Sequence, residues 1–336
     1  MIKIRIHQIA AALCLPLCLL IFSSCAEGMR ESVFFAMDTV MSLKLYGADS
    51  ADLTDEAEKC VAQLEYCLSK SQNGSVGSIN SGKAGEYPLD TDTYEVLSLS
   101  FALSDATDGA LNVACAPLTS LWRIGQADFK PPSDRAVREV LPLVSKDAFT
   151  LGKTTISKKH DASGLDLGAV GKGYAADKLI GLLEPHSSGG VISLGGNIAL
   201  YGKRPDGKPW KIALKDPLSP EDSLGYFELD GGERYFVSVT GGYERYSDYQ
   251  GKRYIHVLDT ESGYPSDSDL SGVCVISKSG TLSDGLSTAL FVLGCDRALE
   301  FYESGIYDFE ALLTKKSGET LLTAGLADSG IFKFND

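Results

Sequence analysis

Apolar and polar residues alternate along the chain with the periods of both strands and helices. Residues 32–46 follow the two-residue period of a half-buried strand, and a turn is expected near Gly47. Residues 55–69, 94–107 and 282–293 instead repeat apolar side chains at helical spacing. The amphipathic face of the first of these helices is formed by Ala57, Val61, Leu64 and Leu68. The pattern therefore predicts a chain of mixed secondary structure.

The remaining segments extend this mixed pattern. Residues 71–85 are rich in Ser, Gly and Asn, which predicts a loop, and residues 148–157 predict a hairpin that turns at Gly152-Lys153. Further short helical segments are expected at 131–145 and 173–183, and strands at 191–194, 211–214, 236–239 and 273–277. Strands and helices intermix without strict βαβ alternation, so we expect an α+β fold rather than a doubly wound sheet. The sequence contains no internal repeat and no long linker.

The first 24 residues have the pattern of a signal peptide. Lys3 and Arg5 precede an apolar run over residues 9–22, which is too short for a confident membrane span. The sequence Ser23-Ser24-Cys25 resembles a bacterial lipobox, so we expect cleavage before Cys25 and lipidation of this cysteine. Residues 25–31 are then a short tether, and residues 32–336 form the folded domain. Plain secretion or an uncleaved N-terminal anchor is the alternative.

Composition excludes several classes of protein. The 336 residues are 44% apolar and 23% charged, which argues against disorder, collagen and coiled coil. The formal charge of −14, from 45 acidic and 31 basic residues, argues against binding to nucleic acid or to anionic lipid by charge. If the ligand is an anion, its binding must therefore be local.

The eight cysteines do not form a disulfide framework. Cys14 and Cys18 belong to the signal segment, and Cys25 is expected to carry lipid. Cys60 and Cys67 are seven residues apart in one predicted helix, which separates them by about 10.5 Å, whereas a disulfide requires Cα atoms within roughly 7 Å. We expect both to lie as small apolar groups on one buried face.

Three glycine-rich stretches are candidate ligand-binding segments. Residues 165–175 contain three glycines around Lys172 at an expected strand-to-helix transition, where backbone groups and a cation can approach a phosphate or a flavin carbonyl. A glycine-rich turn with a solvated lysine explains the same pattern. Residues 193–198 and 240–245 follow strands and could place backbone N–H groups beside an anion, although a tight turn explains each of them too.

One helix and one histidine carry further candidate chemistry. Asp284 and Thr288 are four residues apart, so a carboxylate and a hydroxyl project from one helix face and could bind a hard cation such as Mg²⁺. The alternative is an aspartate at a helix start and a threonine bonded to a backbone carbonyl. His256 lies in an alternating segment, residues 254–259, from which it could act as a general base or serve a structural role. A hydrolase triad has little support, since no Ser-His-Asp context is present.

The order of these motifs resembles that of the ApbE family of FAD:protein FMN transferases. The resemblance covers essentially the whole chain after the signal segment. The motifs are Met37-Asp38-Thr39, Gly109-Ala110-Leu111-Asn112, residues 165–175, Leu194-Gly195-Gly196-Asn197, Gly242-Tyr243-Glu244-Arg245, His256-Val257-Leu258-Asp259 and Asp284-Gly285-Leu286-Ser287-Thr288. It implies an ApbE-like α+β fold in which mixed or antiparallel sheets pack against helices.

The resemblance also implies an activity and its residues. The reaction is Mg²⁺-dependent transfer of FMN from FAD to a Thr or Ser hydroxyl of an acceptor flavoprotein through a phosphoester bond, with release of AMP. The positions matching FAD contacts are Met37, Ala110, Leu111, Asn112, Asp166, Lys172 and Leu258. The metal positions are Asp284, Thr288 and the backbone carbonyl of Ala169, with Ser287 as a weaker candidate. His256 matches the residue that activates the acceptor hydroxyl, and Asp284 counts as catalytic through the metal.

The resemblance further implies a lipid-anchored protein on the extracytoplasmic face of the cell membrane. Its acceptor would be a flavoprotein of a membrane or extracellular electron-transfer system, and nucleic acid is not a partner. Two alternatives stay open: an Mg²⁺-dependent FAD pyrophosphatase that yields FMN and AMP, and a non-catalytic flavin-binding lipoprotein.

The chain departs from the family pattern at four places. Asp38 stands where glycine is usual, Asn112 where aspartate is common, and Thr260 where proline is usual. The loop around Ser71 lacks the aromatic residue that often stacks on the ligand, which leaves that role to Tyr66 or Tyr87.

Overall fold

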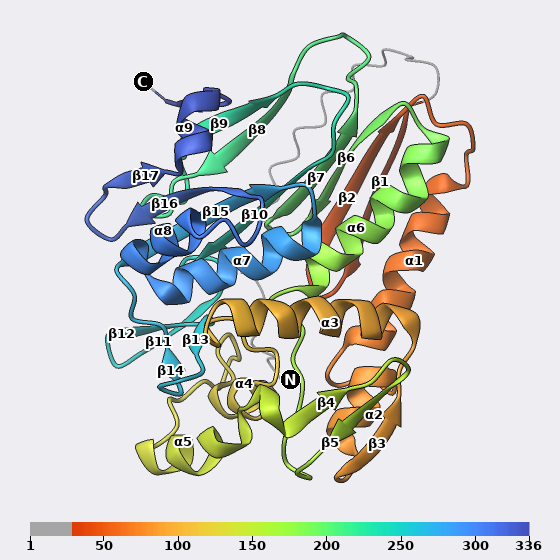
Figure 1. Ribbon diagram of the computed structural model, residues 1–336. Coiled ribbons are helices and arrows are strands. Elements are labelled where there is room, and N and C mark those ends of the chain that lie inside the picture. Colours follow the sequence, from red (N-terminus) through yellow and green to blue (C-terminus); the bar gives the residue numbers. More distant parts are fainter. Residues whose placement is uncertain (1–28, 336) are drawn as a thin grey trace, which may run out of the picture.

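A central antiparallel sheet organises the protein. The computed structural model describes residues 29–335; the predicted signal segment and Cys25 lie outside this range. The sheet has eight strands (Figure 1), in the order β1 (Arg30–Ala36), β2 (Thr39–Tyr46), β6 (Gly189–Leu194), β7 (Asn197–Gly202), β10 (Tyr235–Gly241), β15 (Leu270–Ser277), β16 (Glu310–Lys315) and β17 (Thr320–Leu322). Each neighbouring pair is antiparallel. The predicted α+β fold is confirmed.

Helices cover one face of this sheet and a small second sheet covers the other. The helices are α1 (Leu53–Leu68), α6 (Gly171–Leu183) and α7 (Gly280–Leu293), seen in front of the strands in Figure 1. Their apolar sides and the facing strands form the main core. On the opposite face, β8 (Trp210–Lys215), β9 (Ser223–Leu229) and β18 (Phe332–Phe334) enclose a second core. Both faces of the middle strands are therefore buried.

A third group of elements lies on the far side of α3 (Thr91–Ala106), which runs between it and the main body in Figure 1. This group contains α2 (Ser75–Ser81), β3 (Gly85–Pro88), α4 (Ala116–Trp122), α5 (Asp134–Val140), η1 (Leu141–Leu143), η2 (Lys146–Ala148), β4 (Phe149–Leu151) and β5 (Thr155–Lys158). The remaining elements are η3 (Glu184–His186), β11 (Tyr246–Tyr249), β12 (Lys252–Ile255), β13 (Leu258–Asp259), β14 (Tyr264–Pro265), α8 (Cys295–Glu303) and α9 (Ala324–Ser329). No helix among residues 29–335 combines the length and apolar character needed to cross a membrane.

Most of the strongly periodic segments form the predicted elements. The helices expected at 55–69, 94–107, 173–183 and 282–293 correspond to α1, α3, α6 and α7. The hairpin expected at 148–157 is β4 and β5, and the four predicted strands are β6, β8, β10 and β15. The segment that precedes α6 is irregular, however, so the expected strand-to-helix transition at 165–175 is wrong.

The single strand predicted over 32–46 is also wrong. The chain turns back at Met37 and Asp38, and β1 pairs with β2 from Arg30↔Leu45 to Ala36↔Thr39. Both turn residues have positive φ, 49° for Met37 and 59° for Asp38, as a two-residue hairpin turn requires. Glycine or asparagine usually marks such a turn. Aspartate also tolerates this conformation, so the alternating pattern continued through the turn without a visible break.

The loop predicted over 71–85 contains α2. Ser, Gly and Asn are poor helix formers, but Val76 and Ile79, three residues apart, are both fully buried in the main core. Tertiary packing thus outweighs the local preference. The predicted absence of a disulfide framework is confirmed for residues 29–335, where all five cysteines are free. Of the two cysteines expected on a buried helix face, Cys67 is buried and Cys60 is partly buried.

Candidate functional site

The crossing of α6 and α7 places a carboxylate at the start of α6. Gly173 and Gly280 meet at this crossing so closely that a Cβ on either would overlap the carbonyl oxygen of the other. Asp284, one turn further along α7, is 4% exposed, and its Oδ2 accepts a hydrogen bond from Gly173 N at 2.8 Å. A buried anion is stabilised here because the first N–H groups of a helix lack intrahelical partners and carry partial positive charge.

Lys172 lies beside this carboxylate. Its Nζ is 3.9 Å from Asp284 Oδ1 and 3.4 Å from the carbonyl oxygen of Gly168. The side chain is 28% exposed, so it is not the freely solvated lysine of the alternative interpretation. Lys172 is instead a partly buried cation at the start of α6.

Asp177 holds the same two helices together from the other side. Its carboxylate accepts hydrogen bonds from Gly280 N at 2.7 Å and from Thr281 N at 2.8 Å, which satisfies two free N–H groups of α7. We did not predict this role, because Asp177 and α7 are about one hundred residues apart in sequence.

Hydroxyl groups complete the surroundings of Asp284. Ser287 Oγ lies 2.8 Å from Thr240 Oγ1, and it also donates to the Asp284 carbonyl at 2.8 Å. Thr288 Oγ1 is 3.5 Å from Thr240 Oγ1 and is partly accessible, whereas Ser287 is fully buried. Thr240, in β10 at the start of the glycine-rich stretch 240–245, was not singled out from the sequence as a site residue.

These oxygen atoms could hold a magnesium ion whose remaining ligands are water and substrate oxygens. In the described residues no group of three or more His, Cys, Asp or Glu side chains is placed to hold a metal. Mg²⁺ is usually held by one or two carboxylates, with water and substrate phosphate oxygens completing the shell. The N–H of Gly173 donates to Asp284; in a continuing helix it would donate to the Ala169 carbonyl instead. No backbone N–H of residues 29–335 donates to the Ala169 carbonyl oxygen. Asp284, Thr288 and the Ala169 carbonyl are the oxygen groups of this region that could hold such an ion.

His256 lies between β12 and β13 rather than on a strand, which corrects the expectation from the alternating pattern. Its backbone N–H donates to the Arg245 carbonyl at 3.0 Å, and its Nδ1 is 3.0 Å from the same oxygen. Burial lowers the pKa of His256 to about 4; the hydrogen bond to the carbonyl opposes this, and the charges of Arg245 and Lys172 add to it. The imidazole is neutral at physiological pH, with Nδ1–H donating and the Nε2 lone pair free.

Three turns meet at one end of the central sheet. A Cβ at Gly195, between β6 and β7, would overlap Thr39 beside the Met37-Asp38 turn. A Cβ at Gly196 would come within 3.0 Å of Glu244 Oε1, in the segment that follows β10. Met37 is thereby brought to the same end of the sheet as Glu244 and its neighbour Arg245.

Glu244 is a further titratable group of this region. Burial of its carboxyl raises its pKa to about 7; the charge of Lys172 opposes the shift and that of Asp284 adds to it. The residue as a whole still contacts solvent, since only its carboxyl end is packed against the Gly196 turn. In the sequence this glutamate appeared only within the 240–245 stretch and the Gly242-Tyr243-Glu244-Arg245 motif, without a role of its own.

Asp166 and Asn112 belong to a second cluster. Asp166 Oδ2 accepts from Lys70 Nζ at 2.6 Å and from Thr119 Oγ1 at 2.7 Å, and its Oδ1 accepts from Gly168 N at 3.1 Å. Burial raises the pKa of Asp166, but the Lys70 charge and these hydrogen bonds outweigh it and lower the pKa overall. Asp166 N donates to the Val113 carbonyl at 2.8 Å, which ties this cluster to the segment that contains Asn112.

Two departures from the family pattern contact each other. Asn112 Nδ2 donates to Thr260 Oγ1 at 3.3 Å, and Thr260 Oγ1 lies 3.4 Å from the Gly109 carbonyl oxygen. Asn112 and Thr260 therefore form a linked pair. Leu111 is 1% exposed and packs in the main core, so only its backbone is available to a ligand. Leu258 packs beside Trp122 in a separate small core.

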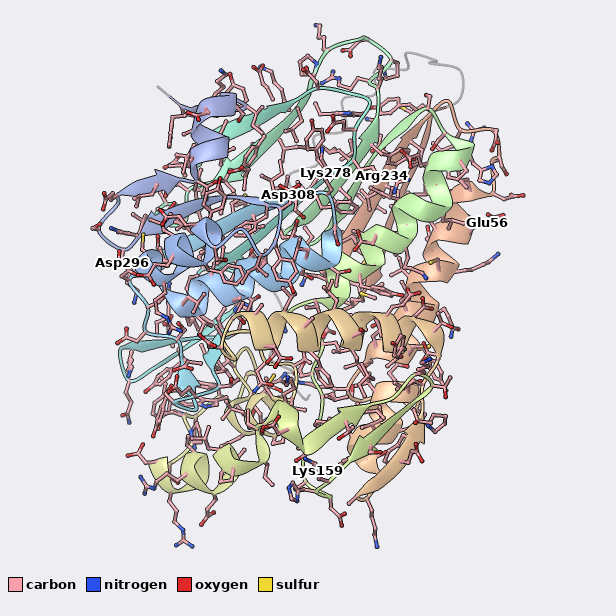
Figure 2. All side chains as sticks on the ribbon, in the orientation of Figure 1. Glu56, Lys159, Arg234, Lys278, Asp296 and Asp308 are labelled. Atoms are coloured by element: carbon pink, nitrogen blue, oxygen red, sulfur yellow. The ribbon has the colours of Figure 1, made fainter. Side chains whose placement is uncertain are left out.

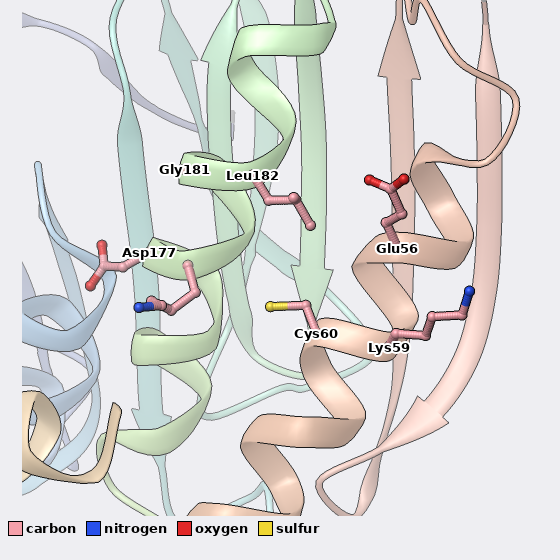
Figure 3. A pocket seen from close by; sticks show the side chains of 7 residues that line it. Glu56, Lys59, Cys60, Asp177, Gly181 and Leu182 are labelled. Atoms are coloured by element: carbon pink, nitrogen blue, oxygen red, sulfur yellow. The ribbon is translucent and has the colours of Figure 1, made fainter. Parts of the chain in front are cut away.

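One groove of the protein lies away from this site. A groove of about 650 Å³ lies between α1 and α6 (Figure 3), and apart from Asp177 its lining shares no residue with the clusters described above. A smaller hollow of about 270 Å³ is lined by Lys70, Ser71 and Asn80 among others, next to the Asp166 cluster. Lys70 thus lines this hollow and also donates to Asp166, a residue expected to contact FAD.

The fold and the clusters define an antiparallel α+β protein in which a buried carboxylate and a lysine lie together at the start of a helix. Comparison with known proteins is consistent with this class. The sequence profile of the ApbE family matches residues 37–313. The chain belongs to the ApbE family.

Individual relatives extend over nearly the whole chain. An FAD:protein FMN transferase of Klebsiella pneumoniae is 33% identical over 298 residues, which are 86% of this chain and 90% of that protein. The crystal structure of the Pseudomonas stutzeri flavinyl transferase ApbE has a TM-score of 0.79 at 28% identity, covering 92% of this chain and 98% of that one. The ApbE protein of Thermotoga maritima has a TM-score of 0.80 at 25% identity, covering 89% and 98%.

Proposed function

We propose that this chain is an Mg²⁺-dependent FAD:protein FMN transferase, which moves FMN from FAD to a Thr or Ser hydroxyl of an acceptor flavoprotein and releases AMP. The observation that carries the proposal is the buried Asp284 carboxylate, held by Gly173 N at 2.8 Å next to Lys172. Relatives named FAD:protein FMN transferase support it. Met37, Ala110, Leu111, Asn112, Asp166, Lys172 and Leu258 are the proposed FAD contacts.

Asp284, Thr288 and the Ala169 carbonyl would hold Mg²⁺. When bound, the ion would polarise the pyrophosphate and stabilise negative charge on the departing AMP. Lys172 adds a second positive charge beside the same carboxylate. Local cations and helix N–H groups are needed because the whole chain carries a charge of −14 and repels an anion at long range.

His256 is the proposed general base. The Arg245 carbonyl fixes the ring with Nδ1–H as donor, so Nε2 can take the proton of the acceptor hydroxyl. The hydroxyl oxygen then bonds to the phosphorus of the FMN half. The bond from that phosphorus to the bridging oxygen breaks, and AMP leaves with this oxygen.

Intact mass and nucleotide analysis test the proposal. The protein is incubated with FAD, Mg²⁺ and the apo form of a flavoprotein subunit that carries FMN on threonine when mature. We expect an acceptor mass increased by one FMN and an equal amount of AMP. Free FMN with AMP would instead indicate FAD hydrolysis, and unchanged FAD would indicate binding alone; either result contradicts the transferase proposal.

We also propose that the protein is anchored by lipid on Cys25 at the extracytoplasmic face of the cell membrane, near an acceptor of an electron-transfer system. Support comes from the lipobox-like sequence and from the short distance along the chain between Cys25 and the first strand, which begins at Arg30. Cys25→Ser is expected to prevent fatty-acid labelling and to release the protein from the membrane fraction. Unchanged labelling would contradict the anchor.

A further inference from the structure

The hairpin of β11 and β12 stands apart from the other sheets. Its strands pair with each other from Tyr246↔Ile255 to Tyr249↔Lys252, and with no other strand of residues 29–335. In Figure 1 it lies with β13 and β14 at one side of the molecule, below α8. An isolated two-stranded hairpin is at best marginally stable, so its attachments to the rest of the protein hold it in place.

Both ends of the hairpin are fixed at the proposed general base. The chain enters the hairpin after Arg245 and leaves it at His256, and the Arg245 carbonyl accepts the hydrogen bond from His256 N at 3.0 Å. The same carbonyl lies 3.0 Å from His256 Nδ1. A molecule bound to the hairpin is therefore held next to His256.

One face of the hairpin packs on the protein, and the opposite face is exposed at Tyr246 and Arg253, while Ile255 at its base packs against the main core. Gly125 N donates to Ser247 Oγ at 2.8 Å, and the ring of Tyr254 lies 5.4 Å from that of Phe129. Side chains alternate between the two faces of a strand, so Tyr246 and Arg253 point to the opposite face. Tyr246 is 39% exposed, and the Arg253 guanidinium lies 3.7 Å from the centre of its ring.

The charge of the hairpin differs from that of the chain. The hairpin itself, residues 246–255, contains Lys252 and Arg253 but only one carboxylate, Asp248, and thus carries one net positive charge in a chain of −14; Arg245 directly precedes it. Asp248 pairs with Arg253 at 3.1 Å, which leaves Lys252, near the turn, without an ion-pair partner in the described chain. Arginine and tyrosine are also the residues most often found at the energetic centre of protein interfaces.

We propose that the exposed face and tip of this hairpin, namely Tyr246, Lys252 and Arg253, bind the acceptor protein through an acidic segment near its acceptor hydroxyl. The charge complementarity would draw the acceptor to the site and orient it, and the hairpin's base would deliver the hydroxyl to His256. This inference rests on the proposed transferase function and adds the surface and charge of its protein partner.

Charge reversal tests the inference. We compare the wild type with Lys252→Glu/Arg253→Glu, using the apo flavoprotein subunit described above, FAD and Mg²⁺. We expect the KM for the acceptor to rise by about tenfold or more, while kcat at saturating acceptor and the KM for FAD stay unchanged. Tyr246→Ala removes the ring without a change of charge and is expected to weaken acceptor binding in the same selective way.

The matched control is Lys208→Glu/Lys333→Glu, which changes the net charge equally at two exposed lysines outside the hairpin. It is expected to leave the KM for the acceptor within about twofold of the wild type. An unchanged acceptor KM in the hairpin variants, an equal loss in the control, or a parallel loss of FAD affinity would each overturn the inference. No FMN adduct with the wild-type protein would instead overturn the proposed function, and the role of the hairpin with it.

Discussion

At the residue scale, the site depends on polar groups whose state is set by their neighbours. Asp284 is buried but is compensated by a helix N–H group and a lysine, and His256 is kept neutral by burial and two nearby cations. An anionic carboxylate and a neutral imidazole are the forms that metal binding and proton acceptance require. The surroundings of His256 thus keep its imidazole in the form that can accept a proton.

Replacing Asp284 tests its role directly. Asp284→Ala is expected to lower FMN transfer by at least about 10³-fold, because the site loses its one buried carboxylate. Asp284→Asn should lose activity as well, but its amide oxygen can still accept from Gly173 N, so its Tm should stay near the wild type. Activity is measured across a range of Mg²⁺ concentrations. Full activity of either variant would contradict the assignment.

The pH dependence of transfer tests the state of His256. A pKa lowered to about 4 means that the base form dominates above this pH. We therefore expect kcat/KM for FAD to stay level from pH 8 to about pH 5 and to fall below that, rather than near 6.5 as for an ordinary histidine.

His256→Gln should reduce transfer by about 10²- to 10⁴-fold. Glu244→Gln is the control, since Glu244, with its pKa raised to about 7, is the other group of the site that titrates within the measured range. A fall near pH 6.5 that persists in this control would contradict the neutral-base assignment.

At the element scale, the crossing of α6 and α7 determines the site. Gly173 and Gly280 allow the two backbones to touch, and Asp177 accepts the first N–H groups of α7. Any side chain at the crossing would separate the helices and move Asp284 from the start of α6. The glycines of residues 165–175 therefore serve helix packing as well as any approach to a ligand.

Two alanine substitutions in α6 distinguish the effect of packing on stability from the effect of helix propensity. Gly173→Ala is expected to lower the free energy of unfolding by about 1–3 kcal/mol through overpacking, and to reduce transfer. Gly181→Ala, in the same helix with open space around the new Cβ, should be neutral or stabilise by up to about 1 kcal/mol. Urea unfolding measures both. Equal effects at the two positions would contradict the packing argument.

At the scale of the whole molecule, an acidic protein must bind an anionic dinucleotide. Charged side chains are spread over the surface, as the six labelled in Figure 2 illustrate, and their sum is −14. Under the proposed function, binding energy for the phosphates comes from the few groups around Lys172 and Asp284 and from the proposed Mg²⁺. FAD binding and Mg²⁺ binding should accordingly depend on each other.

Thermal unfolding measures this dependence. FAD with Mg²⁺ is expected to raise Tm clearly more than FAD with a chelator, since a ligand at 100 times its Kd stabilises the native state by about 2.7 kcal/mol. In Asp284→Ala the shift caused by FAD should no longer depend on Mg²⁺. An identical shift with and without Mg²⁺ in the wild type would contradict coupled binding.

Much of the fold could be predicted from local patterns, and the failures have physical causes. The helices with regular apolar spacing, α1, α3, α6 and α7, were found because one buried face repeats along the chain. Met37 and Asp38 hid a hairpin turn because neither is a glycine, and α2 was missed because buried Val76 and Ile79 outweigh poor helix formers. The alternating segment 254–259 covers the end of β12 and β13 with a break at His256, and β11 and β14 were not predicted.

The candidate site shows the same division between what local sequence patterns predict and what tertiary packing decides. The sequence by itself determined the class of elements, the family, and which residue types carry chemistry, because periodicity and motifs are local. Only the tertiary structure decided which polar groups meet: Gly173 and Asp284 are 111 residues apart, and Lys70 and Asp166 are 96 apart. Thr240 and Glu244 lie in the predicted stretch 240–245, but the roles of these two residues and of Asp177 arise only from the packing of α6 on α7 and of three turns at one end of the sheet.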